Sequence, residues 1–133
     1  MIGLLIICHC ELGREFLNAA ELIMGRLENT DAIAITQTEQ SEEMLKSISD
    51  KIDALDQGQG VIILTDMFGG TPSNLSLSFL EEGRVEVLSG ANLPMVVSVA
   101  QSRDSLSLTE LGEKARREGR RSIALAGKML KSA

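Results

Sequence analysis

The stretch Ile2-Gly3-Leu4-Leu5-Ile6-Ile7 decides the fold of this chain, together with Val61-Ile62-Ile63-Leu64-Thr65. Both runs are apolar along almost their whole length, which is typical of strands covered on both faces of a parallel sheet. Two further runs, at residues 32–36 and 85–88, are shorter or alternate with polar residues, as edge strands do. The sequence therefore predicts four strands, with the first and third at the centre of the sheet.

Helical patterns lie between the predicted strands. Residues 11–26 carry apolar side chains at spacings of three and four, and residues 41–57 do so after Ser41. The two expected stripes are Leu12, Phe16, Ala20, Ile23 and Leu27 in the first helix and Leu45, Ile48, Ile52 and Leu55 in the second.

Pro72 suits the first turn of a further helix, with Thr71 as the expected N-cap and Gly83 as the expected end. Residues 107–121 predict a last long helix. The pattern of residues 123–130 is ambiguous.

This order of elements predicts an α/β fold, with a single domain over residues 1–133. We expect an open, mostly parallel sheet of strand order 2-1-3-4 with helices on both faces. In that order the first and third strands are neighbours, and the crevice between such strands is the usual ligand site of an open α/β sheet. His9 follows the first strand and Asp66 follows the third, so the topology is expected to bring these two residues together.

The composition excludes several classes of function. The 133 residues include only 2% aromatic side chains and carry a net charge of −6, which argues against a nucleic-acid-binding surface. The sequence shows neither a signal peptide nor an apolar stretch long enough to span a membrane. Cys8 and Cys10 are too close for a comfortable disulfide and fit a reducing compartment, so we expect a cytoplasmic protein.

Positive charge gathers near the C-terminal end of the chain. Seven of the 13 basic residues lie there, namely Lys114, Arg116, Arg117, Arg120, Arg121, Lys128 and Lys131. Such a cluster is typical of a solvated helix face, and a docking patch or an oligomer contact is the alternative.

His9 is the one histidine of the chain, and it stands where a phosphoryl carrier would need it. A neutral imidazole is a good nucleophile toward a phosphoryl group near neutral pH. A carboxylate bonded to its other ring nitrogen would fix the tautomer and stabilise the cation that forms, and Asp66 is the candidate. The phosphoryl oxygens need hydrogen-bond donors, which Gly69, Gly70 and Thr71 could supply at a helix start. This chemistry requires no metal and no nucleotide cofactor.

Two other interpretations use the cysteines. Cys8 and Arg14 fit the Cys-x5-Arg pattern of a small cysteine-dependent phosphatase, in which a thiolate attacks and the arginine holds phosphate. The segment between them is poor in glycine, and Glu15 stands where a hydroxyl is usual. In the other interpretation, Cys8-His9-Cys10 binds a metal. Alternate residues of an extended segment face opposite sides, however, so His9 would point away from both cysteines.

Three features together resemble one family. They are the histidine directly after an apolar N-terminal strand, the loop Asp66-Met67-Phe68-Gly69-Gly70-Thr71-Pro72-Ser73-Asn74 and the turn Gly90-Ala91-Asn92-Leu93-Pro94-Met95. The combination resembles the mannose-family enzyme IIA domain of the bacterial phosphoenolpyruvate-dependent sugar phosphotransferase system (PTS), over essentially the whole chain. One departure is clear, because members of that family commonly carry glycine directly after the histidine and this chain has Cys10.

The resemblance implies that His9 accepts a phosphoryl group from phospho-HPr and passes it to an enzyme IIB protein, for carbohydrate uptake or regulation. Asp66 would orient the imidazole, and Thr71 with the neighbouring backbone would hold the phosphate. The rim that contacts the protein partners would consist of Met67, Phe68, Asn92 and Pro94.

The resemblance also implies a homodimer, in which residues 123–130 form a C-terminal edge strand that is exchanged onto the partner's sheet. The phosphoryl acceptor would be a separate chain, and any membrane association would be indirect, through the sugar permease. The alternative output is a protein that reports its phosphorylation state to a regulator or supplies a dihydroxyacetone kinase.

Overall fold

The computed structural model describes residues 1–36 and 40–131. The strands in these ranges are β1 (Gly3–His9), β2 (Thr30–Ile35), β3 (Val61–Thr65) and β4 (Val85–Ser89). The helices are α1 (Leu12–Met24), α2 (Ser41–Leu55), α3 (Thr71–Leu77), α4 (Leu93–Ser102), α5 (Leu108–Arg121) and α6 (Ala126–Lys131). Strands and helices alternate along the chain as far as α4, and the alternation from β1 to β4 is the one that the sequence predicts.

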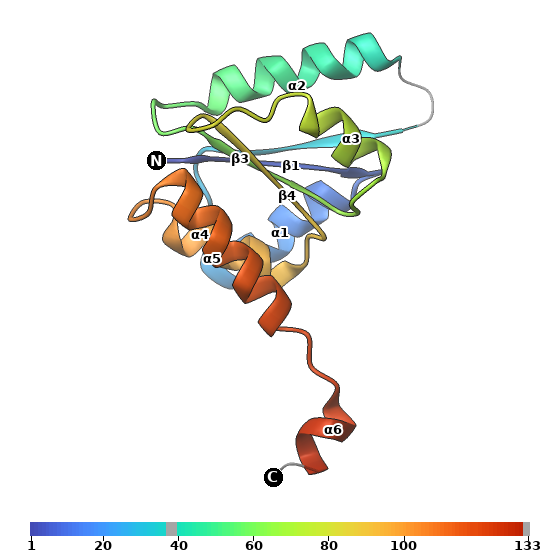
Figure 1. Ribbon diagram of the computed structural model, residues 1–133, viewed down its shortest axis with the longest axis vertical. Helices are drawn as coiled ribbons and strands as arrows, with labels where there is room; N and C mark the ends of the chain where they lie inside the picture. The colour runs from blue at the N-terminus through green and yellow to red at the C-terminus, as the bar shows by residue number, and fades with distance from the viewer. Residues whose placement is uncertain (37–39, 132–133) are drawn as a thin grey trace.

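The four strands form one sheet in the order β2-β1-β3-β4, and every neighbouring pair is parallel. The predicted strand order is therefore confirmed. β1 and β3 lie side by side in the centre, with Leu4 opposite Ile62 and Ile7 opposite Thr65. The sheet is twisted, so that β4 lies obliquely to β1 (Figure 1).

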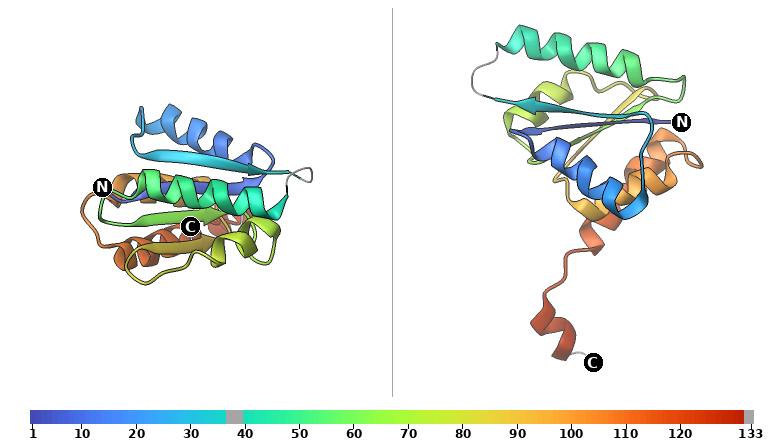
Figure 2. Two further views of the ribbon diagram at one scale, coloured as in Figure 1. Left: turned by 90° about the horizontal axis from the view of Figure 1, so that it is seen from above. Right: turned by 180° about the vertical axis from the view of Figure 1, so that it is seen from behind.

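Helices cover both faces of the sheet (Figures 1 and 2). α2 and α3 lie on one face, and α1, α4 and α5 lie on the other. Because side chains alternate along a strand, Leu5 and Ile7 of β1 pack on the α2 side, whereas Ile6 and Cys8 pack on the α1 side. His9 continues the first series, so its side chain leaves β1 on the face that carries α2 and α3.

The buried side of α1 matches the predicted stripe in part, because Ala20 is buried and Phe16 and Leu27 pack against the core. Leu12 and Ile23 belong to that stripe, but they are 42% and 61% exposed. The residues that α1 buries are Gly13, Leu17 and Ala20. A Cβ at Gly13 would lie 3.0 Å from a backbone carbonyl oxygen of β1, so the helix contacts the sheet closely at this glycine. The side of the helix that carries Gly13 therefore faces the sheet.

The other long helices follow the sequence more closely. In α2, Met44 is buried in place of Leu45, and the remaining three predicted positions are confirmed. α5 begins with a capping box, in which the Ser107 hydroxyl accepts from the Glu110 N–H at 3.2 Å and the Glu110 carboxylate accepts from the Ser107 N–H at 3.0 Å. Ser107 is therefore the N-cap of the last predicted helix.

α3 is shorter than predicted and begins differently. Gly70 is its N-cap, so Thr71 is the first helical residue instead of the cap. The helix ends at Leu77 rather than near Gly83, because the chain turns there and Glu81 forms an isolated bridge with the start of β4.

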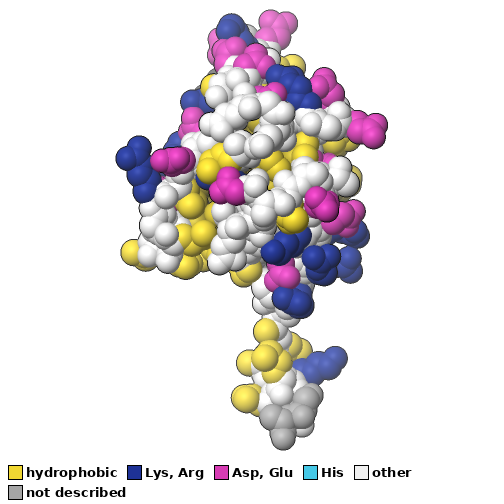
Figure 3. Space-filling view, turned by 90° about the vertical axis from the view of Figure 1, so that its left-hand side faces the viewer, with side chains coloured by type: hydrophobic (Ala, Val, Ile, Leu, Met, Phe, Trp, Pro, Cys, Tyr) yellow, Lys and Arg dark blue, Asp and Glu magenta, His cyan; other side chains and the backbone are white. Residues whose placement is uncertain are grey.

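The C-terminal segment stands away from the sheet (Figures 1 and 3). In the described part of the chain, residues 123–131 form no edge strand, because their hydrogen bonds are local: two backbone N–H groups of α6 donate to the Leu125 carbonyl. The C-terminal edge strand is expected only as a segment exchanged in a dimer, which a single chain does not test, so it stays a prediction. The exposed apolar side chains of the segment are Ile123, Leu125, Met129 and Leu130.

The predicted basic cluster lies mostly on the outer face of α5. Arg116, Arg117, Arg120 and Arg121 are exposed and line one shallow hollow of about 440 Å³. Figure 3 shows basic side chains gathered where the body of the molecule meets the C-terminal segment. No helix in the described ranges has both the length and the apolar content needed to cross a membrane.

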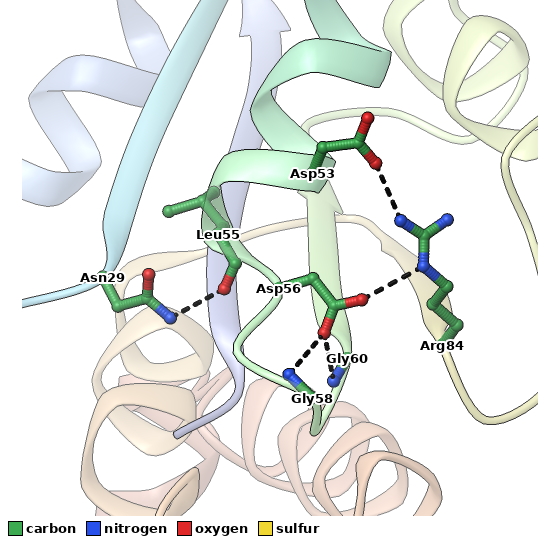
Figure 4. A network of polar contacts seen from close by, with 7 residues as sticks. All are labelled: Asn29, Asp53, Leu55, Asp56, Gly58, Gly60 and Arg84. Atoms are coloured by element: carbon green, nitrogen blue, oxygen red, sulfur yellow. Dashed lines mark hydrogen bonds and ion pairs between the residues drawn. The ribbon is translucent and has the colours of Figure 1, made fainter.

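A polar network closes the amino-terminal edge of the sheet (Figure 4). Asp56, directly after α2, accepts hydrogen bonds from the N–H groups of Gly58 and Gly60 at 2.9 and 3.2 Å. The Arg84 guanidinium donates to Asp56 at 3.1 Å and to Asp53 at 2.8 Å. The network joins the end of α2 to the starts of β3 and β4, so it fixes the edge opposite to the one where His9 lies.

Candidate functional site

His9 and Asp66 meet at the carboxyl ends of β1 and β3, as the predicted topology requires. The Nδ1 atom of His9 lies 2.8 Å from Oδ2 of Asp66, and the backbone N–H of His9 donates to the same oxygen at 3.0 Å. The backbone N–H of Met67 donates to the other carboxylate oxygen at 3.1 Å. The imidazole is 47% exposed and the carboxylate only 11%, so the pair has one open and one largely buried member.

The ionisation of Asp66 sets the tautomer of the imidazole. Burial acts to raise the pKa of Asp66, but the hydrogen bonds that it accepts from His9 outweigh this effect and hold the pKa below its usual value. Asp66 is therefore a carboxylate at neutral pH and can only accept hydrogen bonds. Since Nδ1 must then carry the proton, the lone pair of the neutral imidazole is on Nε2.

Gly70 brings the backbone of the following loop against the imidazole. A Cβ at this position would lie 3.1 Å from Cε1 and 3.8 Å from Nε2 of His9, so a side chain there would crowd the ring. The preceding Gly69 has a φ of +84°, a left-handed conformation that favours glycine. Of the predicted phosphate-binding residues, Gly70 thus lies beside the Cε1–Nε2 edge of the ring.

The first turn of α3 follows immediately. Thr71 is exposed and is the first residue of this helix. Asn74, whose role the sequence did not indicate, donates from its side-chain amide to the Gly69 carbonyl at 3.3 Å and from its backbone N–H to the Gly70 carbonyl at 2.9 Å. These bonds hold the glycine loop against α3. An asparagine in the first turn of a helix that follows a glycine pair is the signal that could have indicated this role.

Three of the four residues predicted for the partner rim are exposed, and the fourth, Asn92, is hydrogen-bonded within the chain. Met67 and Phe68 are 61% and 78% exposed in the loop after β3, and Pro94 is exposed in the first turn of α4. Asn92, in contrast, is the N-cap of α4: its side chain accepts from the N–H three residues on at 3.0 Å and donates to a carbonyl of α5 at 2.9 Å. The Asn92 amide therefore links α4 to α5.

Cys10 lies directly after His9 in a left-handed backbone conformation. Its φ is +52°, where a side chain is strained and glycine is not. This conformation gives a physical reason for glycine at this position in the family that the sequence resembles. The thiol is exposed and free, and His9 still reaches Asp66, so the cost of Cys10 to the unphosphorylated site is backbone strain.

The phosphatase interpretation does not fit the structure. Cys8 is fully buried on the α1 side of β1, and burial raises the pKa of its thiol to about 12, so the thiolate is not formed at neutral pH. Arg14 does not face a phosphate site, because its guanidinium donates to Asp31 at 2.7 Å.

The metal interpretation does not fit either. Cys8 and His9 leave β1 on opposite faces, so they cannot bind one ion together. Within residues 1–36 and 40–131, no three His, Cys, Asp or Glu side chains are grouped as a metal site would require.

Known proteins share both the sequence pattern and the fold. The family model described as "PTS system fructose IIA component", EIIA-man, matches residues 3–116. The chain belongs to the EIIA-man family. It is therefore a IIA component of the phosphotransferase system, a phosphoryl carrier, as the resemblance implies.

Individual EIIA proteins match most of the chain. The sorbose-specific EIIA component of Lacticaseibacillus casei is 32% identical over 112 residues, which are 81% of this chain and 78% of that protein. The mannose-specific EIIAB component of Escherichia coli K12 is 31% identical over 104 residues, and the chain spans only 32% of its length. The EIIA component of Streptococcus agalactiae superimposes with a TM-score of 0.87 at 25% identity, covering 96% of this chain and 99% of that one.

Proposed function

We propose that this EIIA-man protein carries a phosphoryl group on Nε2 of His9, which it receives from phospho-HPr and transfers to an enzyme IIB protein. The observation that carries the proposal is the 2.8 Å contact between His9 Nδ1 and the Asp66 carboxylate, which leaves Nε2 as the free nucleophile. The ring is half exposed, so a protein that presents a phosphoryl group can reach it.

The transfer needs one nucleophile and one leaving group. The lone pair of Nε2 attacks the phosphorus while the P–N bond of the donor phosphohistidine breaks, and the donor imidazole leaves with the electron pair of that bond. The phosphorylated His9 ring gains positive charge, which the Asp66 carboxylate stabilises through Nδ1–H. Transfer onward to enzyme IIB uses the same geometry, with the His9 imidazole as the leaving group.

The phosphoryl oxygens need donors beside Nε2. We assign this role to the hydroxyl of Thr71 and to the backbone of Gly69 and Gly70. The 3.8 Å between Nε2 and the position of a Cβ at Gly70 supports the assignment, since it means that the backbone approaches the reacting nitrogen without a side chain in between. We assign the exposed Met67 and Phe68, together with Pro94, to contacts with the protein partners.

We further propose a homodimer that exchanges residues 123–130. The apolar side chains of this segment are between 58% and 79% exposed in the single chain, and such a surface is typical of a segment that packs against another protein. The free state of both cysteines supports a cytoplasmic location. Contact with a membrane would be indirect, through the sugar permease.

Intact mass after incubation with phosphoenolpyruvate, enzyme I and HPr tests the proposal. We expect the gain of one phosphoryl group that is lost in acid, because a P–N bond is acid-labile whereas a serine or threonine phosphate is not. The variant His9→Ala should gain none while its circular dichroism spectrum stays that of the wild type. An unphosphorylated wild type in a tube where HPr is phosphorylated would refute the proposal.

A second output uses the same phosphohistidine, because a regulatory protein or a dihydroxyacetone-kinase donor would also be phosphorylated on His9. Addition of a purified mannose-family enzyme IIB protein separates the outputs. The transport role predicts that the phosphoryl group moves from His9 to the IIB protein, whereas a purely regulatory role predicts that it stays.

A further inference from the structure

We infer that a chain of three hydroxyl groups, Thr65–Ser89–Ser73, positions the start of α3 relative to His9 and Asp66. The inference rests on the proposed function and adds positioning residues to it. The Thr65 hydroxyl donates to Ser89 Oγ at 2.8 Å, and Ser73 Oγ lies 3.1 Å from the same oxygen. A serine hydroxyl offers one donor and two acceptor sites, so Ser89 can bond to both neighbours at once.

The three hydroxyls connect the two halves of the proposed site. Thr65 is the last residue of β3 and directly precedes Asp66, and Ser89 lies opposite Thr65 at the end of β4. Ser73 is the third residue of α3, two residues after Thr71. The chain of hydroxyls therefore runs from the strand that carries the carboxylate to the helical turn that carries the proposed phosphate donors.

The position of these hydroxyls in the sheet is distinctive. On the face covered by α2 and α3, both β3 and β4 present two apolar side chains before they present Thr65 and Ser89 at their ends. Thr65 and Ser73 are fully buried, and Ser89 is half-buried. Apolar packing at this point would hold α3 without a preferred direction, whereas hydrogen bonds fix both a distance and a direction.

The loop between Asp66 and α3 is held at its two ends, by the Met67 N–H on Asp66 at 3.1 Å and by the Asn74 N–H on the Gly70 carbonyl at 2.9 Å, but its other contacts are weaker. The Gly70 N–H reaches the Met67 carbonyl at 3.4 Å, and the Asn74 amide reaches the Gly69 carbonyl at 3.3 Å, which are both long hydrogen bonds. The bonds of the hydroxyl chain are shorter than these two long bonds and more sheltered from solvent, and they join α3 to the sheet, which the bonds within the loop do not do. Without the Ser89 hydroxyl, two buried hydroxyls would lose a partner and the first turn of α3 would shift to satisfy them.

Ser89→Ala and Thr65→Val test the inference, since each interrupts the chain of hydroxyls and leaves His9 and Asp66 in place. We expect each variant to slow phosphoryl transfer from phospho-HPr to His9 about tenfold, measured by rapid quench, because displaced donors stabilise the transition state less. The KM for phospho-HPr should stay unchanged, since the partner rim is untouched. Ser89→Thr, which keeps a hydroxyl, should restore the rate.

Ser76→Ala is the matched control. Ser76 is also fully buried on α3, but its hydroxyl donates to the Pro72 carbonyl and is outside the Thr65–Ser89–Ser73 chain. Its rate should equal that of the wild type even if it loses as much thermal stability as Ser89→Ala. Equal slowing by Ser76→Ala, or wild-type rates in folded Ser89→Ala and Thr65→Val, would overturn the inference alone. If the wild type itself takes up no phosphoryl group, the proposed function fails, and the inference fails with it.

Discussion

His9 depends on a single carboxylate for both its orientation and its tautomer. Asp66 accepts from the ring and from the backbone of His9 through one oxygen, so a change at this side chain alters the nucleophile without touching it. Asp66→Asn preserves the size of the side chain but removes the charge that, in the proposed transfer, stabilises the phosphorylated ring. We expect transfer to slow roughly 100-fold in a rapid-quench measurement, with the fold retained.

The control for that prediction is the chemical nature of the product that Asp66→Asn forms at long reaction times. Because His9 itself forms the P–N bond, the histidine of Asp66→Asn should still become phosphorylated at long times. The product should still be acid-labile. A wild-type rate in Asp66→Asn would show that the carboxylate neither orients nor stabilises the imidazole.

Cys10 offers a test of backbone strain beside the site. Its left-handed φ of +52° costs a residue with a Cβ about 1–2 kcal/mol, of which the larger unfolded-state entropy of glycine offsets a part. Cys10→Gly should therefore raise the free energy of unfolding by about 0.5–1 kcal/mol in urea titrations. Cys10→Ala keeps the Cβ and should match the wild type. A gain in stability with Cys10→Ala equal to that with Cys10→Gly would mean that the thiol, and not the backbone, is responsible.

At the residue scale, the sequence was sufficient to pair His9 with Asp66 because the pairing follows from strand order. It was not sufficient to find the hydroxyl chain, because Thr65, Ser73 and Ser89 are distant in sequence and ordinary as residue types. Their contact depends on the register of β3 against β4 and on the seating of α3, which are tertiary properties.

At the scale of elements, the carboxyl-terminal and amino-terminal edges of the sheet carry different kinds of polar group. The carboxyl edge carries the reactive groups, whereas the amino edge is fixed by Asp56 and its partners. Hydrogen bonds from the Gly58 N–H and from Arg84 hold the pKa of Asp56 below its usual value of 3.8, despite some burial. The carboxylate form is therefore favoured in the folded protein, and its contribution to stability is present above pH 3.8 and is lost as pH falls through the lower folded-state pKa.

Asp56→Asn should accordingly lower the urea midpoint at pH 7, and the difference from the wild type should shrink as the pH is lowered below 3.8. The control is Asp50→Asn, because Asp50 is 64% exposed on α2 and forms a surface ion pair with Lys46. Surface pairs of this kind contribute little, so Asp50→Asn should leave the midpoint nearly unchanged. A difference for Asp56→Asn that does not vary with pH would contradict the role given to its charge.

The helices show where pattern reading is least reliable. The apolar periodicity of α1 was visible, but Leu12 and Ile23 are exposed because Gly13 lets the helix approach the sheet along another line. In α1 a tertiary contact overrode a local preference. α3 is followed by a local turn, in which Glu81 bridges Val85 four residues on and Gly83 has a left-handed φ of +80°. The sequence shows this glycine, but it does not show how far before it the helix stops.

At the scale of the whole molecule, the C-terminal segment is the part that the isolated chain leaves exposed. If residues 123–130 pack on a partner subunit, Leu125→Glu should weaken the dimer, seen as a lower mass in light scattering after gel filtration at micromolar concentration. Leu22→Glu is the control, because Leu22 is an apolar residue of α1 that is 90% exposed and outside the segment. A monomeric wild type, or equal effects of both substitutions, would contradict the proposed exchange.

The predicted strand order is confirmed, whereas the exchanged C-terminal strand stays a prediction, and the difference has a physical reason. Strand order follows from the chain's own hydrophobic pattern and from the handedness of crossovers. The conformation of residues 123–131 has no such internal determinant, since none of the residues of α6 is buried against the rest of the chain.

The alternation of side chains along β1 has a further consequence for the chemistry. Neighbouring residues of this strand deliver a thiol to one side of the sheet and an imidazole to the other, and only the imidazole side meets Asp66. A slip of β1 by one residue against β3 would exchange the two, pressing the imidazole into an apolar layer and presenting a thiol to the carboxylate. The register of the β1 backbone against the β3 backbone, and not any side chain, therefore decides whether a nitrogen or a sulfur atom faces Asp66.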